Sequence, residues 1–199
     1  KLFVNGLHRN ETRSIVRPDG TAEIFEYGPI VVGALATHTN RVYHGDPDST
    51  GTNIDAGTKT ETVHNSAGRI ISTKVYDVPS GILLSSETYE YDGYSRLTNT
   101  VYLDGTSAST AYDCCSLSST TDRDGTVTAY TADALKRVLT TTRIGITASN
   151  VYDAVGNILS TVRIGTNGNA ITTASATFDN AGRQMSATDA VGNTTSYTN

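Results

Sequence analysis

The sequence has 199 residues, with 15 Lys and Arg against 20 Asp and Glu, a net charge of −5 and a pI near 5.3. This acidic balance, without a basic cluster, argues against a nucleic-acid partner, because the phosphate backbone is bound by a basic stripe. No apolar run is long enough to predict a membrane span. The 33 Thr, 18 Gly and 11 Tyr favour many short β-strands joined by turns.

Residues 1–60 are predicted to be a less regular β segment. The stretch "RPDGTAEIFEYG" from Arg17 predicts a turn followed by a strand. Residues 44–58, "HGDPDSTGTNIDAGT", are predicted to form an exposed loop. Its first half resembles a calcium loop, but the last ligand position holds Gly57 in place of Glu, so we expect a polar loop without a metal.

From residue 61 to residue 199 the chain is predicted to be an array of repeats that continues beyond its C-terminus. The repeated motif is aromatic-Asp-x-x-Gly-Arg/Asn-aliphatic, and successive copies lie about twenty residues apart. Two copies, at His64 and at Ala132, lack the aromatic residue. The repeat positions are Tyr76, Asp77, Tyr91, Asp92, Arg96, Tyr112, Asp113, Asp133, Arg137, Tyr152, Asp153, Gly156, Phe178, Asp179, Gly182 and Arg183.

A second phrase alternates with the first. The stretches "TDRDGTVTAYT" from Thr121 and "TDAVGNTTSYT" from Thr188 share residues at six offsets. Their repeat positions are Asp122, Gly125, Tyr130, Asp189, Gly192 and Tyr197.

A period of about twenty residues with two turn signals matches a β-hairpin of two short strands. The Asp of each motif is expected to accept backbone N–H bonds in a turn, where the Gly supplies a positive φ. Two stretches begin with "RIG", at Arg143 and Arg163, and the second is six residues longer before its aromatic residue. We expect this insertion at the hairpin tip, where growth is tolerated. The absence of Pro after residue 79 agrees with a continuous sheet.

The two alternating phrases resemble the tyrosine-aspartate (YD) repeats of the RHS family. The resemblance implies an all-β fold in which antiparallel hairpins form a continuous, spiralling sheet, as a shell or a solenoid-like ribbon. It also implies a large extracellular or cell-surface protein of which this chain is a fragment. Its partners would be other parts of the same protein or further copies of itself, with an enclosed toxin segment or a surface glycan as further candidates.

The titratable residues point to structure more than to chemistry. Asp and Arg face each other within single copies, and because this arrangement is repeated, we interpret it as a turn cap with a modest ion pair. The repeated aromatic residues are expected to pack as a ladder in which each ring covers the next, with a glycan platform as the alternative. No cofactor, catalytic residue or metal ligand set is predicted, and the four His have no ligand spacing. The chain is therefore expected not to be an enzyme.

The only two cysteines, Cys114 and Cys115, are adjacent. An ordinary disulfide needs Cα atoms roughly 4.4 to 6.8 Å apart, whereas one peptide bond separates them by about 3.8 Å. We expect two reduced thiols on opposite faces of a strand, with a strained vicinal bridge or a soft-metal half-site as alternatives.

Three functions remain as hypotheses. The first is a wall or scaffold of a β-shell, the second is a filament subunit that docks through unpaired strand edges, and the third is an adhesin that binds through its hairpin tips.

Overall fold

The computed structural model describes residues 12–28 and 38–198, and all regular structure in these ranges is β-strand. Each strand pairs antiparallel with a strand adjacent to it in sequence. The predicted all-β fold of antiparallel hairpins is therefore confirmed. The strands are β1 (Thr12–Val16), β2 (Ala22–Tyr27), β3 (His38–Pro47), β4 (Ile54–His64), β5 (Ile70–Asp77), β6 (Leu83–Tyr91), β7 (Leu97–Tyr102), β8 (Ser107–Tyr112), β9 (Leu117–Thr121), β10 (Val127–Ala132), β11 (Val138–Arg143), β12 (Ile146–Tyr152), β13 (Ile158–Ile164), β14 (Ala170–Phe178), β15 (Gln184–Asp189) and β16 (Thr194–Ser196).

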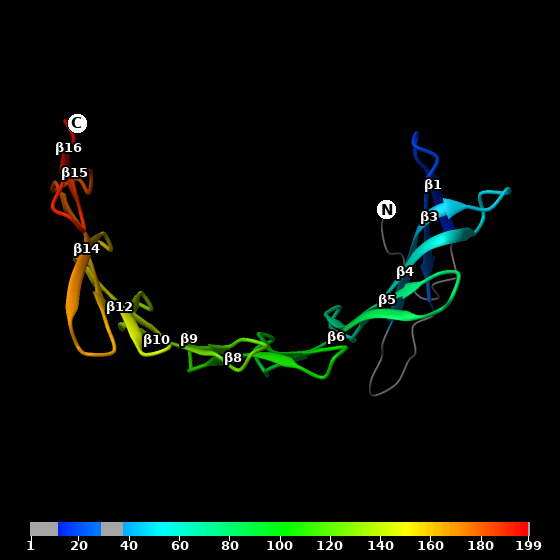
Figure 1. Cartoon of the computed structure of the whole chain (residues 1–199), viewed down its shortest axis with the longest axis horizontal. Helices are drawn as coiled ribbons and strands as arrows, with labels where there is room; N and C mark the ends of the chain where they lie inside the picture. Colours follow the sequence, from blue (N-terminus) through cyan, green and yellow to red (C-terminus); the bar gives the residue numbers. More distant parts are fainter. Residues whose placement is uncertain (1–11, 29–37, 199) are drawn as a thin grey trace. The chain divides into compact units, whose positions relative to one another are not determined.

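The chain forms two compact units, Lys1–Ser107 and Ala108–Asn199. In each unit the hairpins follow one another in chain order, as the colours of Figure 1 show. Successive turns of such a meander lie at alternate ends of the strands, and each of these two sides of the sheet is called an edge of the meander below. The predicted boundary near residue 60 stays a prediction, and part of the segment before it, residues 1–11 and 29–37, lies outside the described residues.

The first unit contains a small hydrophobic core. Ala22, Ile24 and Ile54 are buried, and Tyr43 and Val78 pack against them. Ile24 and Tyr43 are cross-strand partners on β2 and β3, so the core lies on one face of these strands.

A row of alternating charge crosses four strands on that same face. The register pairs Glu26 with Arg41, Arg41 with Glu61, and Glu61 with Lys74. Nε of Arg41 lies 2.8 Å from a carboxylate oxygen of Glu61. Opposite charges directly across a sheet stabilise its register.

The loop predicted at residues 44–58 is shorter in the structure. Strands β3 and β4 extend to Pro47 and from Ile54, which leaves only residues 48–53 as the connection. Gly45 and Gly57 face each other in the ladder, and a Cβ on Gly45 would lie 2.0 Å from the Ala56 carbonyl oxygen. The predicted loop was wrong at both ends. Gly45 and Gly57 suggested a turn in the sequence, but in the structure they allow the backbones of two paired strands to approach closely.

The second unit is a sheet without a hydrophobic core. Among residues 108–198, Thr128 is the one buried side chain, with 5% exposed, and no hydrophobic side chain is buried. Both faces of β8–β16 are therefore open within the described residues. A sheet normally buries one face against another layer, whereas no layer covers either face of this unit within the described residues.

The two faces of the second unit differ in chemistry. One face carries the larger side chains, including Tyr130, Tyr152 and Phe178. The other is rich in Thr and Ser, and its cross-strand partners join their hydroxyl groups at 2.6 to 2.8 Å. These hydroxyl pairs are Thr131 with Thr140, Thr142 with Thr147, Thr177 with Ser186 and Thr188 with Thr194.

Candidate functional site: the repeated corners

The repeated motif forms a hairpin corner, which the copy at Asp179 illustrates. The N–H of Asp179 donates to the carbonyl of Arg183, and the N–H of Gly182 donates to the carbonyl of Asp179, both at 2.9 Å. This is a turn followed by a left-handed residue, the usual form of a short hairpin loop. Oδ1 of Asp179 accepts the N–H groups of Ala181 and Arg183 at 2.9 Å. Nε of Arg183 donates to Oδ2 of Asp179 at 2.8 Å.

The same arrangement recurs along the chain. Asp92 pairs with Arg96 at 2.7 Å and Asp133 pairs with Arg137 at 2.6 Å. Where the sixth position is Asn, its amide takes the place of the guanidinium. These amide contacts are 2.8 Å long and join Asn157 to Asp153 and Asn193 to Asp189.

A copy without Asp also forms the corner. Oδ1 of Asn65 accepts the N–H groups of Ala67 and Arg69 at 3.0 Å. The corner therefore depends on a side-chain acceptor more than on a negative charge, as in other Asx turns.

The fifth motif position has a left-handed backbone in all of these corners. Gly156 has a φ of 104° and Gly182 a φ of 75°. Ser95 and Lys136 take the same position with φ values of 76° and 67°. Since non-glycine residues pay a steric cost there, these two corners are held by the bonds around them.

A β-bulge follows each copy of the aromatic-Asp motif. Tyr152 pairs with Ile158 and Val151 pairs with Ser160, so Leu159 has no partner in the ladder. The same shift follows His64, Tyr76, Tyr91, Tyr112, Ala132 and Phe178. The pairings next to the corners at Asp122 and Asp189 show no such shift. The two phrases thus encode two kinds of corner, which the sequence alone did not separate.

The aromatic residues contact arginines of neighbouring corners in two places. The guanidinium of Arg137 lies 4.7 Å from the ring centre of Tyr152, and the Tyr152 hydroxyl donates to the Val138 carbonyl at 2.9 Å. Likewise, Arg69 lies over Tyr91, whose hydroxyl donates to the Ile70 carbonyl at 2.7 Å. For these two tyrosines the expected ring-on-ring ladder was wrong, because a guanidinium covers the ring face and joins successive corners of one sheet edge.

Two copies of the motif have modified turns. At Tyr76 the ring is covered by Lys59, whose Nζ lies 4.1 Å from the ring centre. The carboxylate of Asp77 accepts the N–H and hydroxyl of Ser80 in a loop one residue longer. At Tyr112 the turn is one residue shorter, and the N–H of Asp113 donates to the carbonyl of Ser116.

Cys114 and Cys115 lie in this shortened turn and both are exposed as free cysteines. The expectation that they occupy opposite faces of a strand was wrong, because β8 ends at Tyr112 and β9 begins at Leu117.

In the second phrase, Asp122 uses its carboxylate differently. An oxygen of Asp122 lies 2.7 Å from Nη2 of Arg143, which is on β11, while the turn is capped by Asp124 through the N–H of Thr126. Gly125 has a φ of 82°, and Gly192 a φ of 91°. The N–H of Tyr197 donates to the Met185 carbonyl, and Tyr130 pairs with Thr141.

The connection after Arg143 is a two-residue turn that sequence reasoning missed. Ile144 and Gly145 have φ values of 49° and 71°, as a type I′ turn requires. The pattern gave no signal, since Ile is unusual at such a position. In the second "RIG" stretch, residues 165–169 form the turn, so three of the six extra residues lie in the turn and three in the strands.

The electrostatics of the corners favour ionised carboxylates. Backbone N–H groups of Cys115 and Ser116 lower the pKa of Asp113 to about 2. The backbone N–H of Arg183 is the main cause that lowers the pKa of Asp179. These groups stay charged at neutral pH and work as hydrogen-bond acceptors.

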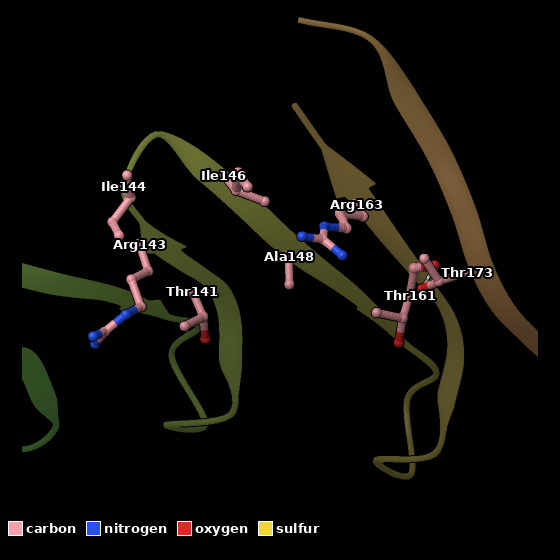
Figure 2. Close-up of a pocket in the computed structure, with 8 residues that line it drawn as sticks. All are labelled: Thr141, Arg143, Ile144, Ile146, Ala148, Thr161, Arg163 and Thr173. Carbon is pink, nitrogen blue, oxygen red and sulfur yellow. Dashed lines mark hydrogen bonds between the residues drawn. The ribbon is translucent and has the colours of Figure 1, made fainter. Parts of the chain in front are cut away.

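An open hollow with a volume of about 510 Å³ lies over β11–β14. Figure 2 shows that Ile146 and Ala148 line it beside Arg143 and Arg163. Ile144 and three threonines complete the lining, and Thr173 donates to the Thr161 carbonyl at 3.1 Å. The accessible lining of this hollow is mainly apolar.

The described residues contain no group of three or more His, Cys, Asp or Glu side chains that could hold a metal ion. In the loop resembling a calcium site, the carboxylate of Asp48 accepts bonds from Thr50, Thr52 and Asn53. His38 and His64 stack at 4.4 Å as cross-strand partners. Within the described ranges, no helix is long and apolar enough to cross a membrane.

No protein-family model and no curated protein matches this chain. Among solved structures, the crystal structure of TcdB2-TccC3-Cdc42 has a similar fold, with a TM-score of 0.54 and 15% identity over 85% of this chain. The crystal structure of TcdB2-TccC3-TEV also matches over 85% of this chain, with a TM-score of 0.25 and 9% identity. The chain spans 9% and 15% of the lengths of these two proteins.

Proposed function

We propose that this chain is a non-enzymatic structural segment of an RHS-type protein and serves as part of the wall of a β-shell. The single observation that carries the proposal is the second unit, a sheet of equivalent corners with no buried hydrophobic side chain among residues 108–198. Such a sheet would gain further stability from a layer that covers it. The fold likeness to the TcdB2-TccC3-Cdc42 structure supports the RHS resemblance.

Further support comes from the corner tips. The fourth motif position carries exposed apolar side chains, with Tyr94 81%, Leu135 69% and Val155 80% exposed. Within a unit these corners share one edge of the meander. Repeated exposed apolar groups are typical of an interface, and another strip of the same protein is the partner that matches their regular spacing.

The RHS resemblance supports placing the parent protein outside the cell or on its surface. It also makes an enclosed toxin segment the first candidate for a cargo. The repetition of the Asp–Arg pair supports a role without catalysis, because an active site needs one arrangement and this one occurs at Asp92, Asp133 and Asp179.

Electron microscopy of the full-length protein that carries this segment tests the proposal. We expect a hollow particle whose wall is a single sheet about 10 Å thick. A solid globular domain at the position of this segment would contradict the shell.

The second candidate is a filament subunit, because an open sheet whose strands continue in one ladder could be extended by strands of a further copy. Sedimentation of the 199-residue chain across concentrations separates the two. Regular rods would favour the filament, whereas a monomer at all concentrations would exclude it.

A further inference from the structure

The two cysteines form a cluster in the turn between β8 and β9. Sγ of Cys115 lies 2.7 Å from Sγ of Cys114, so both thiols point to the same side of the turn. Both residues are exposed and reachable by small molecules. They are also the only cysteines of the chain, so no other thiol competes for them within it.

Two charged groups surround this pair. Nζ of Lys136, from the next corner of the same edge, lies 3.9 Å from Sγ of Cys114. The carboxylate of Asp113 accepts the N–H groups of Cys115 and Ser116 at 2.9 and 2.6 Å. The amide between the two cysteines is thus held by Asp113, and the thiol of Cys114 faces a cation that favours its thiolate.

We propose that Cys114 and Cys115 form a reversible dithiol switch, which closes to a vicinal disulfide when a low-molecular-weight disulfide oxidises it. One cysteine thiolate attacks a sulfur of the oxidant, forms a mixed disulfide and releases one small thiolate. The second cysteine thiolate then attacks the protein sulfur of that bond and releases the other small thiolate. Two electrons pass from the cysteines to the oxidant, and the two thiol protons end on the released thiols.

The geometry of the turn makes this bond reversible. A trans peptide holds adjacent Cα atoms about 3.8 Å apart, below the roughly 4.4 Å minimum of ordinary disulfides. Ring closure must therefore distort the amide of Cys115, whose N–H is bonded to Asp113. Disulfides that deviate from ordinary geometry are more easily reduced, which suits a switch better than a permanent crosslink.

The Cys114 thiol is protonated in the starting state, because its pKa is raised. The hydrogen bond from Cys115 is the main cause that raises the pKa of Cys114, and it outweighs the opposite influence of Lys136. Oxidation should for this reason be slow near neutral pH and faster in alkaline solution, where the thiolate forms.

The test uses the reduced 199-residue chain, glutathione disulfide as oxidant, and intact mass after quenching with iodoacetamide. We expect a monomer lighter by two hydrogen atoms than the reduced chain, without alkylation, and full recovery of both thiols with dithiothreitol. Stable glutathione adducts, disulfide-linked dimers or a doubly alkylated chain after prolonged oxidation would each overturn the proposal.

Single variants provide the matched control. Cys114→Ser and Cys115→Ser cannot close the ring, so each should retain glutathione or dimerise under the same conditions. Circular dichroism should show that both variants keep the β-sheet signal. If either variant loses bound glutathione as fast as the native chain, the second cysteine is not the resolving thiol and the proposal fails.

A second readout follows the turn itself. In the reduced chain, NMR should report the pKa of Asp113 near its value of about 2. Closure should raise this pKa, because the Cys115 N–H moves away from the carboxylate. An unchanged Asp113 titration in a chain whose mass shows the closed bond would contradict the distortion of the turn.

Discussion

Single side chains determine how each corner closes. The Asp of the motif satisfies several backbone N–H groups at once, and the fifth residue accepts a left-handed backbone so that the chain can reverse. Most corners use Gly for this purpose, but Ser95 and Lys136 do not, and Ile144 takes a left-handed backbone in the separate two-residue turn after Arg143. These exceptions are places where the sequence opposes the fold, and they can be tested directly.

We expect Ile144→Asn to stabilise the second unit by about 1 kcal/mol. A left-handed backbone is costly for a β-branched residue such as Ile. Type I′ turns favour Asn at this position. Little packing is lost, since 73% of the Ile144 side chain is exposed. Urea unfolding followed by circular dichroism measures the change, with Ile146→Asn on β12 as the matched control that should destabilise. A lower unfolding midpoint for Ile144→Asn would contradict the turn assignment.

The contributions of the cap and of the negative charge of Asp179 can be tested separately. Asp179→Asn keeps an acceptor for the N–H groups of Ala181 and Arg183, as Asn65 does in its own corner, and should reduce stability only slightly. Asp179→Ala removes the acceptor and should lower the urea midpoint more. Equal effects of the two substitutions would show that the charge matters more than the cap.

The lowered pKa values of the corner carboxylates predict acid lability. A carboxylate with a lower pKa in the folded state than its unfolded value, about 3.9, stabilises the fold above that pH. This contribution is lost as the pH falls from about 4 toward the pKa of about 2 at Asp113. Urea midpoints should therefore be constant from pH 7 to 5 and fall below pH 4. A constant midpoint down to pH 2 would contradict these pKa values.

In each hairpin, the strands are joined by backbone bonds and by matched cross-strand side chains. The aromatic-Asp motif fixes the corner and the bulge after it. The bulge restores the alternation of faces before the next turn. On the hydroxyl-rich face, Thr142 and Thr147 bond to each other at 2.8 Å, so their polar groups are already satisfied within the sheet.

This pairing predicts a measurable coupling. We expect Thr142→Val and Thr147→Val each to destabilise, and the double variant to lose less than the sum, with a coupling of about 0.5 kcal/mol. A double-mutant cycle by urea unfolding measures it. The matched control is Thr142→Val with Ser160→Ala, two positions that are not cross-strand partners and should show additive effects.

Across the chain, stability should be unequal. The first unit has the core of Ala22, Ile24 and Ile54, whereas residues 108–198 bury no hydrophobic side chain. Local opening costs less free energy where few apolar groups are buried.

Hydrogen exchange should report this difference. We expect amides of β2 and β3 to exchange at least about tenfold more slowly than those of β13 to β15. Ile24→Ala should remove the extra protection, because truncating a buried Ile costs roughly 2 to 5 kcal/mol. Equal protection of both units in the native chain would show that something covers the second unit in solution.

The local pattern was sufficient for the all-β fold, the hairpin period and the corner chemistry of Asp92, Asp133 and Asp179. These features depend on residues a few positions apart, whose turn preferences and hydrogen-bonding groups act wherever the chain goes. The structure alone decided which corner carries a bulge, that Arg137 covers Tyr152, and that Cys114 and Cys115 share a turn. Those outcomes depend on where each strand ends and on its register with the next strand, and register follows from the pairing of the ladder, which no single motif encodes.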